Sequence, residues 1–239
     1  MYSKETAEVQ GSTMEILIFE PEGDGPAPGV VVAQHIPIAH TGLENDPWQL
    51  GVGERLAAAG YAAAIPFVFH WWPPEAELVA KREAFRDDWA VADLDAAFAA
   101  LTAREAVDGN RIGIIGHCWG GRVAWLGACH NPDYKAMVTC YGGRIKEPMA
   151  DNATPPIELA DRIACPVLGI FGNEDQNPSP ADVDDLAAAL SAAGVAHEFH
   201  RYDGAGHGFQ TDTDPERYRQ AQADDAWAKI LAFLDRTLK

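Results

Sequence analysis

The sequence predicts an α/β fold in which a mostly parallel central sheet carries helices on both faces. Short apolar runs bounded by turn residues, such as 29–35 and 61–67, are typical of strands buried in the middle of a sheet. Longer stretches with helical spacing separate these runs, and the alternation of strand and helix repeats along the chain. No linker, repeat or low-complexity segment interrupts the pattern, so we expect residues 1–239 to form one domain.

Each expected element follows from the residues within it. An alternating pattern predicts an early strand from about residue 14, and helical spacing predicts a helix over 47–60. Residues 75–104 are expected to form one long helix, which a turn and then a strand over 111–117 follow. The second half repeats this order, with expected strands at 136–143, 165–172 and 196–202 and expected helices at 181–194 and 215–238.

Composition and charge exclude several classes of function. Hydrophobic residues make up 47% of the 239 residues, which is typical of a globular chain. The 36 acidic residues outnumber the 18 basic ones, and the net charge of −18 disfavours binding to nucleic acid or to anionic membranes. The polar N-terminus lacks the apolar centre of a signal peptide, and no apolar run approaches the ~20 residues of a membrane span. We therefore expect a cytoplasmic protein with no nucleic-acid or membrane partner.

The four cysteines show neither metal-binding nor disulfide spacing. Cys118, Cys129, Cys140 and Cys165 lie in apolar surroundings without a C-x-x-C pair, which argues against a zinc site and a disulfide framework. Three of them are expected to fill space in the core, as free cysteines commonly do. Cys118 differs from the others because glycines flank it in the segment "GHCWGG".

Residues 116–120 fit the G-x-S-x-G nucleophile elbow, with cysteine in place of serine. In such an elbow the nucleophile occupies a strained turn, and the small residues beside it let a strand and a helix approach each other. The expected strand over 111–117 and the helical pattern over 121–130 provide these surroundings, and the helix N-terminus favours a thiolate. A tight packing turn with an inert cysteine would leave the same pattern, so the motif needs partners elsewhere in the chain.

Two further residues stand in the order that a nucleophile, acid and histidine triad requires. Asp175 follows the expected strand over 165–172, at the end where open α/β sheets collect ligand-binding residues. His207 lies after the last strand in the glycine-rich loop "YDGAGHGFQ". Glu174 is a rival acid, and a turn in solvent would also explain Asp175. We expect Asp175 and His207 to form a hydrolytic triad with Cys118.

The segments around these three residues resemble the dienelactone hydrolase family of the α/β-hydrolase fold. The resemblance covers nearly the whole chain and rests on "GHCWGG", "FGNEDQNPSP" and "YDGAGHGF", in that order. It implies that Cys118 is the nucleophile, His207 the general base and acid, and Asp175 the group that orients the histidine. It also implies hydrolysis of a small-molecule ester or lactone through a thioester, without a cofactor or metal. The expected oxyanion hole consists of the backbone N–H groups of Trp119 and Ile36.

The sequence departs from the family's pattern at three positions. Where the family typically has a glutamate that pairs with the resting thiol, this chain has His35. His35 either helps to set the ionisation of the thiol or lines the pocket wall. The two arginines that hold the carboxylate of the family's lactone substrate are replaced by Trp71 and Thr211. Arg122 and Arg144 could compensate, but we expect Arg122 to form a structural ion pair.

Aromatic residues are expected to line the substrate pocket. Phe69, Trp71 and Trp72 lie in a segment that should reach its rim, and His35 and Thr211 complete the expected lining. We therefore expect a neutral or aromatic ester or lactone as substrate, for a monomer or homodimer. The alternatives are dienelactone itself, hydrolysed to maleylacetate, and a non-catalytic protein that binds a small molecule as a sensor or carrier. A redox-responsive thiol protein is a third interpretation.

Overall fold

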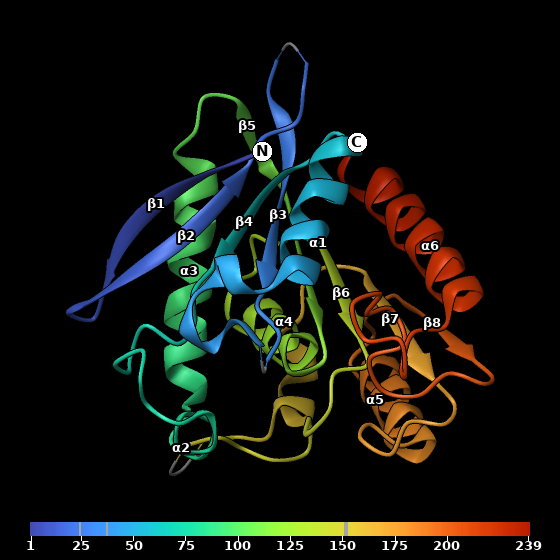
Figure 1. The fold of residues 1–239 in the computed structure, drawn as a ribbon. Coiled ribbons are helices and arrows are strands. Elements are labelled where there is room, and N and C mark those ends of the chain that lie inside the picture. Colours follow the sequence, from blue (N-terminus) through green and yellow to red (C-terminus); the bar gives the residue numbers. More distant parts are fainter. Residues whose placement is uncertain (24, 37, 151–152) are drawn as a thin grey trace.

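A single sheet organises the chain. The computed structural model describes residues 1–23, 25–36, 38–150 and 153–239, and the sheet within them has eight strands in the order β1-β2-β4-β3-β5-β6-β7-β8 (Figure 1). The strands from β4 to β8 pair in parallel, whereas β1 and β2 are antiparallel at one edge. The predicted fold class, a mostly parallel sheet with helices on both faces, is confirmed.

Strands and helices alternate along the chain. The strands are β1 (Tyr2–Val9), β2 (Ser12–Phe19), β3 (Ala27–Ala33), β4 (Ala62–Pro66), β5 (Val107–His117), β6 (Ala136–Cys140), β7 (Val167–Gly172) and β8 (His197–Tyr202). The α-helices are α1 (Pro47–Ala58), α2 (Leu78–Glu83), α3 (Asp87–Thr102), α4 (Trp119–His130), α5 (Pro180–Ala192) and α6 (Gln220–Leu238). Short 3₁₀ helices lie at Ile38–Thr41, Leu43–Asn45 and Pro156–Arg162.

The hydrophobic core lies on both faces of the sheet. Apolar side chains of α3, α4 and α5 pack on one face, and those of α1 and α6 pack on the other. Every residue of β4, β6 and β7 is buried, so these strands have no solvent face. This two-sided burial explains why they are continuous apolar runs rather than alternating ones.

The expected long helix over 75–104 is wrong, because the chain breaks between α2 and α3. Phe85 turns inward at the break, is 4% exposed, and packs edge-on against Trp119 with ring centroids 4.4 Å apart. The backbone N–H of Asp87 then donates to the carbonyl of Met149 at 3.0 Å, which fixes the start of α3. The prediction also missed β1, whose mostly exposed residues form an edge strand that gives no apolar signal.

The fold gathers four loops at one edge of the sheet. Parallel strands end at the same edge, so the segments that follow β3, β5, β7 and β8 meet there. Those segments carry Ile36, Cys118, Asp175 and His207 respectively. The site is therefore built by topology from residues far apart in the sequence.

Candidate active site

Cys118 occupies the turn between β5 and α4. Its φ of 58° and ψ of −129° are strained for a residue with a side chain, as a nucleophile elbow requires. Two hydrogen bonds hold the turn, from Cys118 N to Cys140 O at 3.0 Å and from Gly121 N to Cys118 O at 2.9 Å. A Cβ at Gly116 would lie 1.9 Å from the carbonyl oxygen of Gly120, so strand and helix approach only because residue 116 is glycine.

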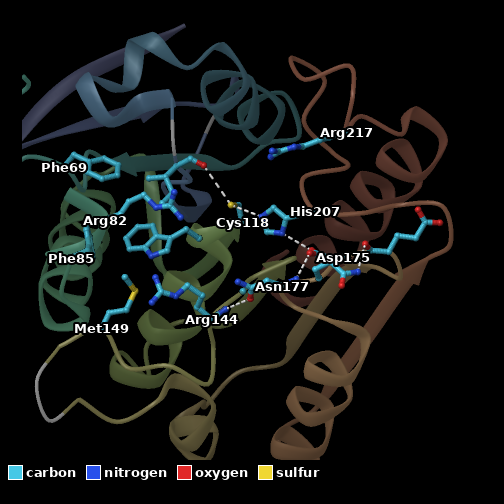
Figure 2. A pocket seen from close by; sticks show the side chains of 15 residues that line it. Phe69, Arg82, Phe85, Cys118, Arg144, Met149, Asp175, Asn177, His207 and Arg217 are labelled. Carbon is cyan, nitrogen blue, oxygen red and sulfur yellow. Dashed lines mark hydrogen bonds and ion pairs between the residues drawn. The ribbon is translucent and has the colours of Figure 1, made fainter. Parts of the chain in front are cut away.

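His207 and Asp175 lie in line with the sulfur of Cys118 (Figure 2). His207 Nε2 lies 3.0 Å from Cys118 Sγ, and His207 Nδ1 lies 2.9 Å from Asp175 Oδ2. Asp175 is buried at 3% exposure, whereas 30% of the His207 side chain remains open to the cavity. Glu174, the rival acid, is exposed, and its backbone N–H donates to Ala205 O. The structure thus brings together the three residues that the sequence motifs single out.

Electrostatics favour the protonated form of His207. Burial by itself would lower the pKa of this imidazole, but the hydrogen bonds to Asp175 and Cys118 outweigh burial and raise the pKa to about 10. A histidine with that pKa is cationic at neutral pH. The arrangement can therefore hold a thiolate beside an imidazolium ion.

Asn177 connects the Asp175 carboxylate to the turn that carries Arg144, and no sequence motif predicted this link. The backbone N–H of Asn177 donates to Asp175 Oδ1 at 2.9 Å, so both carboxylate oxygens of Asp175 have partners. The amide oxygen of Asn177 accepts the backbone N–H of Arg144 at 2.9 Å. A hydrogen-bonded path thus runs from the thiol to the turn after β6 (Figure 2).

The two expected oxyanion donors belong to the segment after β3 and to the start of α4. Ile36 follows β3, and its carbonyl oxygen lies 4.0 Å from Cys118 Sγ. Trp119 is the first residue of α4, where backbone N–H groups have no acceptor inside the helix. Both residues line the same cavity as Cys118 and His207.

The cavity above Cys118 has a volume of about 530 Å³. Its apolar wall consists of Ile36, Phe69, Phe85, Trp119 and Met149. Figure 2 shows Phe69, Phe85 and Met149 on one side of Cys118, with Asp175 and Asn177 on the other. The cavity is large enough for a small organic molecule.

Three arginines also line this cavity, and the sequence analysis named only one of them. Arg144 follows β6, while Arg82 lies on α2 and Arg217 on the loop before α6. The expected aromatic-walled site is therefore incomplete, because these three guanidinium groups line the cavity beside the apolar wall. Arg82 and Arg217 belong to no motif, so only their placement in space identifies them.

Four residues of the expected pocket do not line the cavity. His35 contacts Asp46, and Trp71 donates to Asp93 at 3.2 Å. Trp72 packs behind the wall against Phe69, with ring centroids 6.2 Å apart. Thr211 follows the loop that carries His207, and its backbone N–H donates to Gly208 O at 2.9 Å. Of the expected pocket residues, Phe69 alone lines the cavity that the structure describes.

The direction of the side chains explains why Trp71 and His35 lie outside the cavity. Trp71 points back toward α3, where its ring stacks on Trp89 with centroids 4.7 Å apart. His35 points toward the N-terminus of α1, where the Asp46 carboxylate is fully buried. Sequence position placed these residues in the correct loops, but it does not determine on which side of a loop a side chain lies.

Arg122 forms the structural ion pair expected from the sequence. Its side chain is fully buried on α4, and Nη2 lies 3.0 Å from Asp87 Oδ2. Nη2 also donates to Glu147 O at 2.7 Å, and Nε donates to Arg144 O at 3.2 Å. Arg122 therefore supports the segment that carries Arg144 and Met149 into the cavity.

The described residues contain neither a candidate metal site nor a candidate membrane span. No group of three or more histidine, cysteine, aspartate or glutamate side chains in that part of the chain could hold a metal ion. None of the helices described is both long and apolar enough to cross a membrane.

Comparisons with known proteins identify a matching family and similar proteins. The model described as "Dienelactone hydrolase family" matches residues 14–238. A protein of Escherichia coli (strain K12) named "Putative carboxymethylenebutenolidase" is 34% identical over 235 residues, which cover 94% of this chain and 83% of that protein. A "Carboxymethylenebutenolidase" of Rhodococcus opacus is 31% identical over 199 residues, covering 80% of this chain and 77% of that protein.

Solved structures lead to the same family. A crystal structure entitled "Putative Dienelactone Hydrolase" from Klebsiella pneumoniae has a TM-score of 0.86 and 32% identity, and the match covers 98% of each chain. The structure of P91, a "Dienelactone Hydrolase-like Promiscuous" phosphotriesterase, has a TM-score of 0.80 at 20% identity, which shows a shared fold alone. The matched family model, the similar proteins and the similar structure together show that this chain belongs to the dienelactone hydrolase family.

Proposed function

We propose that this enzyme hydrolyses a small ester or lactone, with Cys118 as nucleophile, His207 as general base and acid, and Asp175 as the residue that orients His207. The observation that carries the proposal is the line of contacts from Cys118 Sγ through His207 Nε2 and Nδ1 to Asp175 Oδ2, with distances of 3.0 and 2.9 Å. These distances are within the hydrogen-bond reach that an activated nucleophile needs. Relatives named carboxymethylenebutenolidase support the choice of an ester or lactone bond.

The reaction begins with a proton transfer inside the triad. The thiol of Cys118 gives its proton to His207 Nε2, and the raised pKa of His207 supports an imidazolium ion in the resting enzyme. The thiolate attacks the substrate carbonyl and forms a tetrahedral oxyanion. When this intermediate collapses, the carbon–oxygen bond breaks, His207 protonates the departing alkoxide, and the acyl group remains on Cys118 as a thioester.

Water completes the cycle. His207, now neutral, takes a proton from a water molecule that attacks the thioester carbonyl. The second tetrahedral intermediate expels the Cys118 thiolate and releases the carboxylic acid. In a lactone the alcohol and the acid belong to one molecule, which leaves as a hydroxy acid or its tautomer. Each step needs only the residues of the triad and water.

The backbone N–H groups of Ile36 and Trp119 are our proposed donors to the oxyanion. The two residues line the cavity together with Cys118, so both lie beside the space in which a substrate carbonyl would react. Backbone donors of this kind are fixed before the substrate arrives, and removing one typically costs about 10²–10³ in kcat.

A substrate with an anionic group is the second candidate, and the arginines favour it. Arg82, Arg144 and Arg217 line the cavity of a protein whose net charge is −18. Arg144 pairs with Glu147 and Arg217 with Asp214, whereas Arg82 forms no ion pair with a carboxylate within the described residues, so its guanidinium group is available to a substrate anion. Dienelactone, which carries a carboxylate, therefore fits better than the neutral or aromatic substrate expected from the sequence.

Trapping of the acyl group tests the proposal directly. Wild type, Cys118→Ala and the matched control Cys129→Ala should be incubated with an aryl acetate and with dienelactone, and both turnover and protein mass should be measured. Cys129 is a free thiol that is buried at 5% exposure and lies outside the cavity, so Cys129→Ala should keep its activity. Cys118→Ala should lose turnover of both compounds.

Three results separate the interpretations. An acyl adduct on Cys118 that forms and disappears at the rate of turnover supports the thioester mechanism. Near-wild-type hydrolysis by Cys118→Ala would contradict it. Stoichiometric labelling of Cys118 without turnover would favour the sensor or carrier interpretation.

A further inference from the structure

The short helix α2 is held on the protein by a lysine. Among its residues, all of which the structure describes, only Lys81 is buried, and the burial of Lys81 is complete. Val79 is 64% exposed, and Leu78 is half-buried. A surface helix normally docks through an apolar stripe, so the position of α2 depends on what the Lys81 side chain binds.

The ammonium group of Lys81 binds two different segments of the chain. Its Nζ donates to His40 O at 2.8 Å, in the 3₁₀ helix after β3, and to Pro74 O at 3.3 Å, in the segment after β4. The same Nζ lies over the ring of Phe69, 5.9 Å from the ring centroid, and aromatic faces attract cations. Lys81 thus joins α2 to the segments after β3 and β4.

These contacts do not include a counter-ion. No carboxylate of the described residues forms an ion pair with Lys81. Burial lowers the pKa of Lys81, although the charge of Glu75 acts in the opposite direction. A buried ammonium group without a carboxylate partner is costly, and an apolar side chain of similar length would avoid that cost. The lysine therefore indicates a role beyond stability.

The first link leads from Lys81 to Ile36, one of the two proposed oxyanion donors. His40, whose carbonyl Lys81 binds, follows Ile36 closely in the chain. The His40 ring also lies edge-on to Phe69, with centroids 6.4 Å apart. On the other side of Ile36 in the sequence, His35 binds Asp46. Ile36 thus lies between two points at which the segment after β3 is tied to other parts of the fold.

The second link leads to Trp119, the other proposed donor. Phe69, over which the ammonium group lies, packs edge-on against Phe85 with centroids 6.2 Å apart. Phe85 packs in the same manner against Trp119 at 4.4 Å. All three rings line the cavity, and Figure 2 shows Phe69 and Phe85 on the same side of Cys118. Lys81 is therefore connected to both segments of the proposed oxyanion hole.

We propose that Lys81 is a positioning residue of the active site, which holds the segments of Ile36 and Trp119 in place for the oxyanion of the transition state. Lys81 lies outside the described lining of the cavity, so it acts through the His40 carbonyl and the Phe69 ring and not on the substrate. The inference rests on the proposed function for the identity of the two oxyanion donors.

Kinetics of Lys81→Met test the proposal, since methionine keeps an unbranched apolar side chain and removes the donors and the charge. With an aryl acetate, kcat should fall by roughly tenfold, less than the loss of a whole donor causes, and KM should change by less than about twofold. The split is expected because oxyanion donors act in the transition state and not on the bound substrate. Lys81→Gln, whose shorter amide can still donate to one carbonyl, should lose about threefold in kcat.

A mimic of the tetrahedral intermediate isolates the oxyanion hole from the rest of the reaction. The Cys118 thiolate adds to the carbonyl carbon of phenyl trifluoromethyl ketone, which forms a carbon–sulfur bond, moves the carbonyl electron pair onto oxygen and expels no group. Lys81→Met should bind this ketone roughly tenfold more weakly than wild type. Alkylation of Cys118 by iodoacetamide should keep its wild-type rate, because His207 forms the thiolate.

Two variants control for charge and for stability. Lys229→Met also removes one positive charge, but Lys229 pairs with Asp225 on α6, so kcat and ketone affinity should not change. Leu190→Ala opens a space in the core beneath α5, where Leu190 is fully buried. It should lower stability in urea unfolding and leave kcat per folded molecule as in wild type.

Each outcome decides the inference. Wild-type kcat and ketone affinity in Lys81→Met would overturn it, and so would an equal fall of kcat in Leu190→Ala, which would show a general effect of stability. Should Lys81→Met fail to fold, wild-type kcat in Lys81→Gln would overturn it instead. Failure of the proposed function is a separate result, in which wild type itself neither hydrolyses the acetate nor binds the ketone through Cys118.

Discussion

The ring of His35, which follows β3, contacts the buried carboxylate of Asp46, the residue that caps α1. Asp46 Oδ1 also accepts the backbone N–H groups of Trp48 and Gln49, both at 3.1 Å. Burial would raise the pKa of Asp46, but the hydrogen bond and charge of His35, with these backbone bonds, hold it below its ordinary value. His35 thus ties the segment before Ile36 to the start of α1, and its Nε2 binds Asp46 rather than the thiol.

We predict that His35→Gln impairs the proposed oxyanion hole and leaves the thiol unchanged. Loss of the contact with Asp46 should let Ile36 shift, which lowers kcat by roughly tenfold, less than complete removal of a donor costs. The pH dependence of Cys118 alkylation by iodoacetamide should stay as in wild type. A displaced alkylation profile would instead support the hypothesis that His35 sets the ionisation of the thiol.

The contrast between Cys118 and Arg82 explains how much of the site the sequence could predict. The elbow is local, because the strand, the glycines and the helix around Cys118 are contiguous and each leaves a pattern. Asp175 and His207 each follow a strand, and parallel strands end at one edge, so their meeting was predictable. Arg82 reaches the cavity from α2 because the chain breaks at Phe85. Periodicity reports burial, and it carries no information about such a break.

Four of the five expected pocket residues lie outside the cavity for a related reason. Trp71 and Thr211 were assigned by their register against the family's arginines, and register fixes a position along the chain but not a side-chain direction. The Asp93 carboxylate attracts Trp71 away from the cavity, through a contact between residues 22 positions apart. Contacts of this kind depend on the packed structure, so sequence patterns alone could not supply them.

Replacement of Arg122 by alanine should be strongly destabilising. Arg122 and Asp87 form a buried ion pair, and Asp87 Oδ2 also accepts the backbone N–H of Met149 at 2.9 Å. Removing one partner leaves a buried charge without compensation, which typically costs about 3–5 kcal/mol. Urea unfolding should show this loss for Arg122→Ala. Arg236→Ala, which breaks an exposed pair with Glu198, should cost at most about 1 kcal/mol; equal losses for the two variants would contradict the structural role of Arg122.

The His207 imidazole should make the stability of the enzyme decrease in alkaline solution. The folded protein raises the pKa of the His207 imidazole from 6.5 to about 10, and in the proposed ion pair the Cys118 thiol supplies the proton that this imidazole holds. An unfolded chain keeps that proton on the thiol up to the ordinary cysteine pKa of about 8.5. The native state therefore holds one proton more than the unfolded chain between about pH 8.5 and about pH 10, and stability should fall across this window. Urea unfolding at several pH values should show that the advantage of wild type over His207→Gln shrinks across this range.

Cys118→Ala provides the matched control for this titration. Cys118→Ala lacks the thiol that supplies this proton and also two of the interactions that raise the pKa of His207, so its loss of stability should begin nearer pH 6.5 and end below about pH 10. A difference between wild type and His207→Gln that stays constant with pH would show that His207 holds no additional proton in the folded state.

His117 should cause the opposite dependence, a loss of stability in acid. It lies beneath the elbow at 1% exposure, edge-on to Trp48 with ring centroids 4.8 Å apart. Burial, with smaller contributions from His35 and Arg55, lowers its pKa to about 3. Below the ordinary pKa of 6.5, His117 therefore binds a proton in the unfolded chain, whereas in the folded protein it stays neutral until the pH falls to about 3. Within that window stability should fall by at most about 1.4 kcal/mol for each unit of decreasing pH.

His117→Leu should remove this sensitivity while keeping a similar side-chain volume. Neither ring nitrogen of His117 has a hydrogen-bond partner among the described residues, so the replacement also relieves a buried unsatisfied group and should not destabilise the protein at neutral pH. Tyr134→Phe is the control, because Tyr134 OH is likewise buried without a partner in the described part of the chain, and burial raises its pKa far from the acid range. Urea unfolding between about pH 6 and about pH 4 should show a smaller loss of stability for His117→Leu than for wild type and Tyr134→Phe. Equal losses for all three proteins would mean that His117 accepts a proton in the folded state.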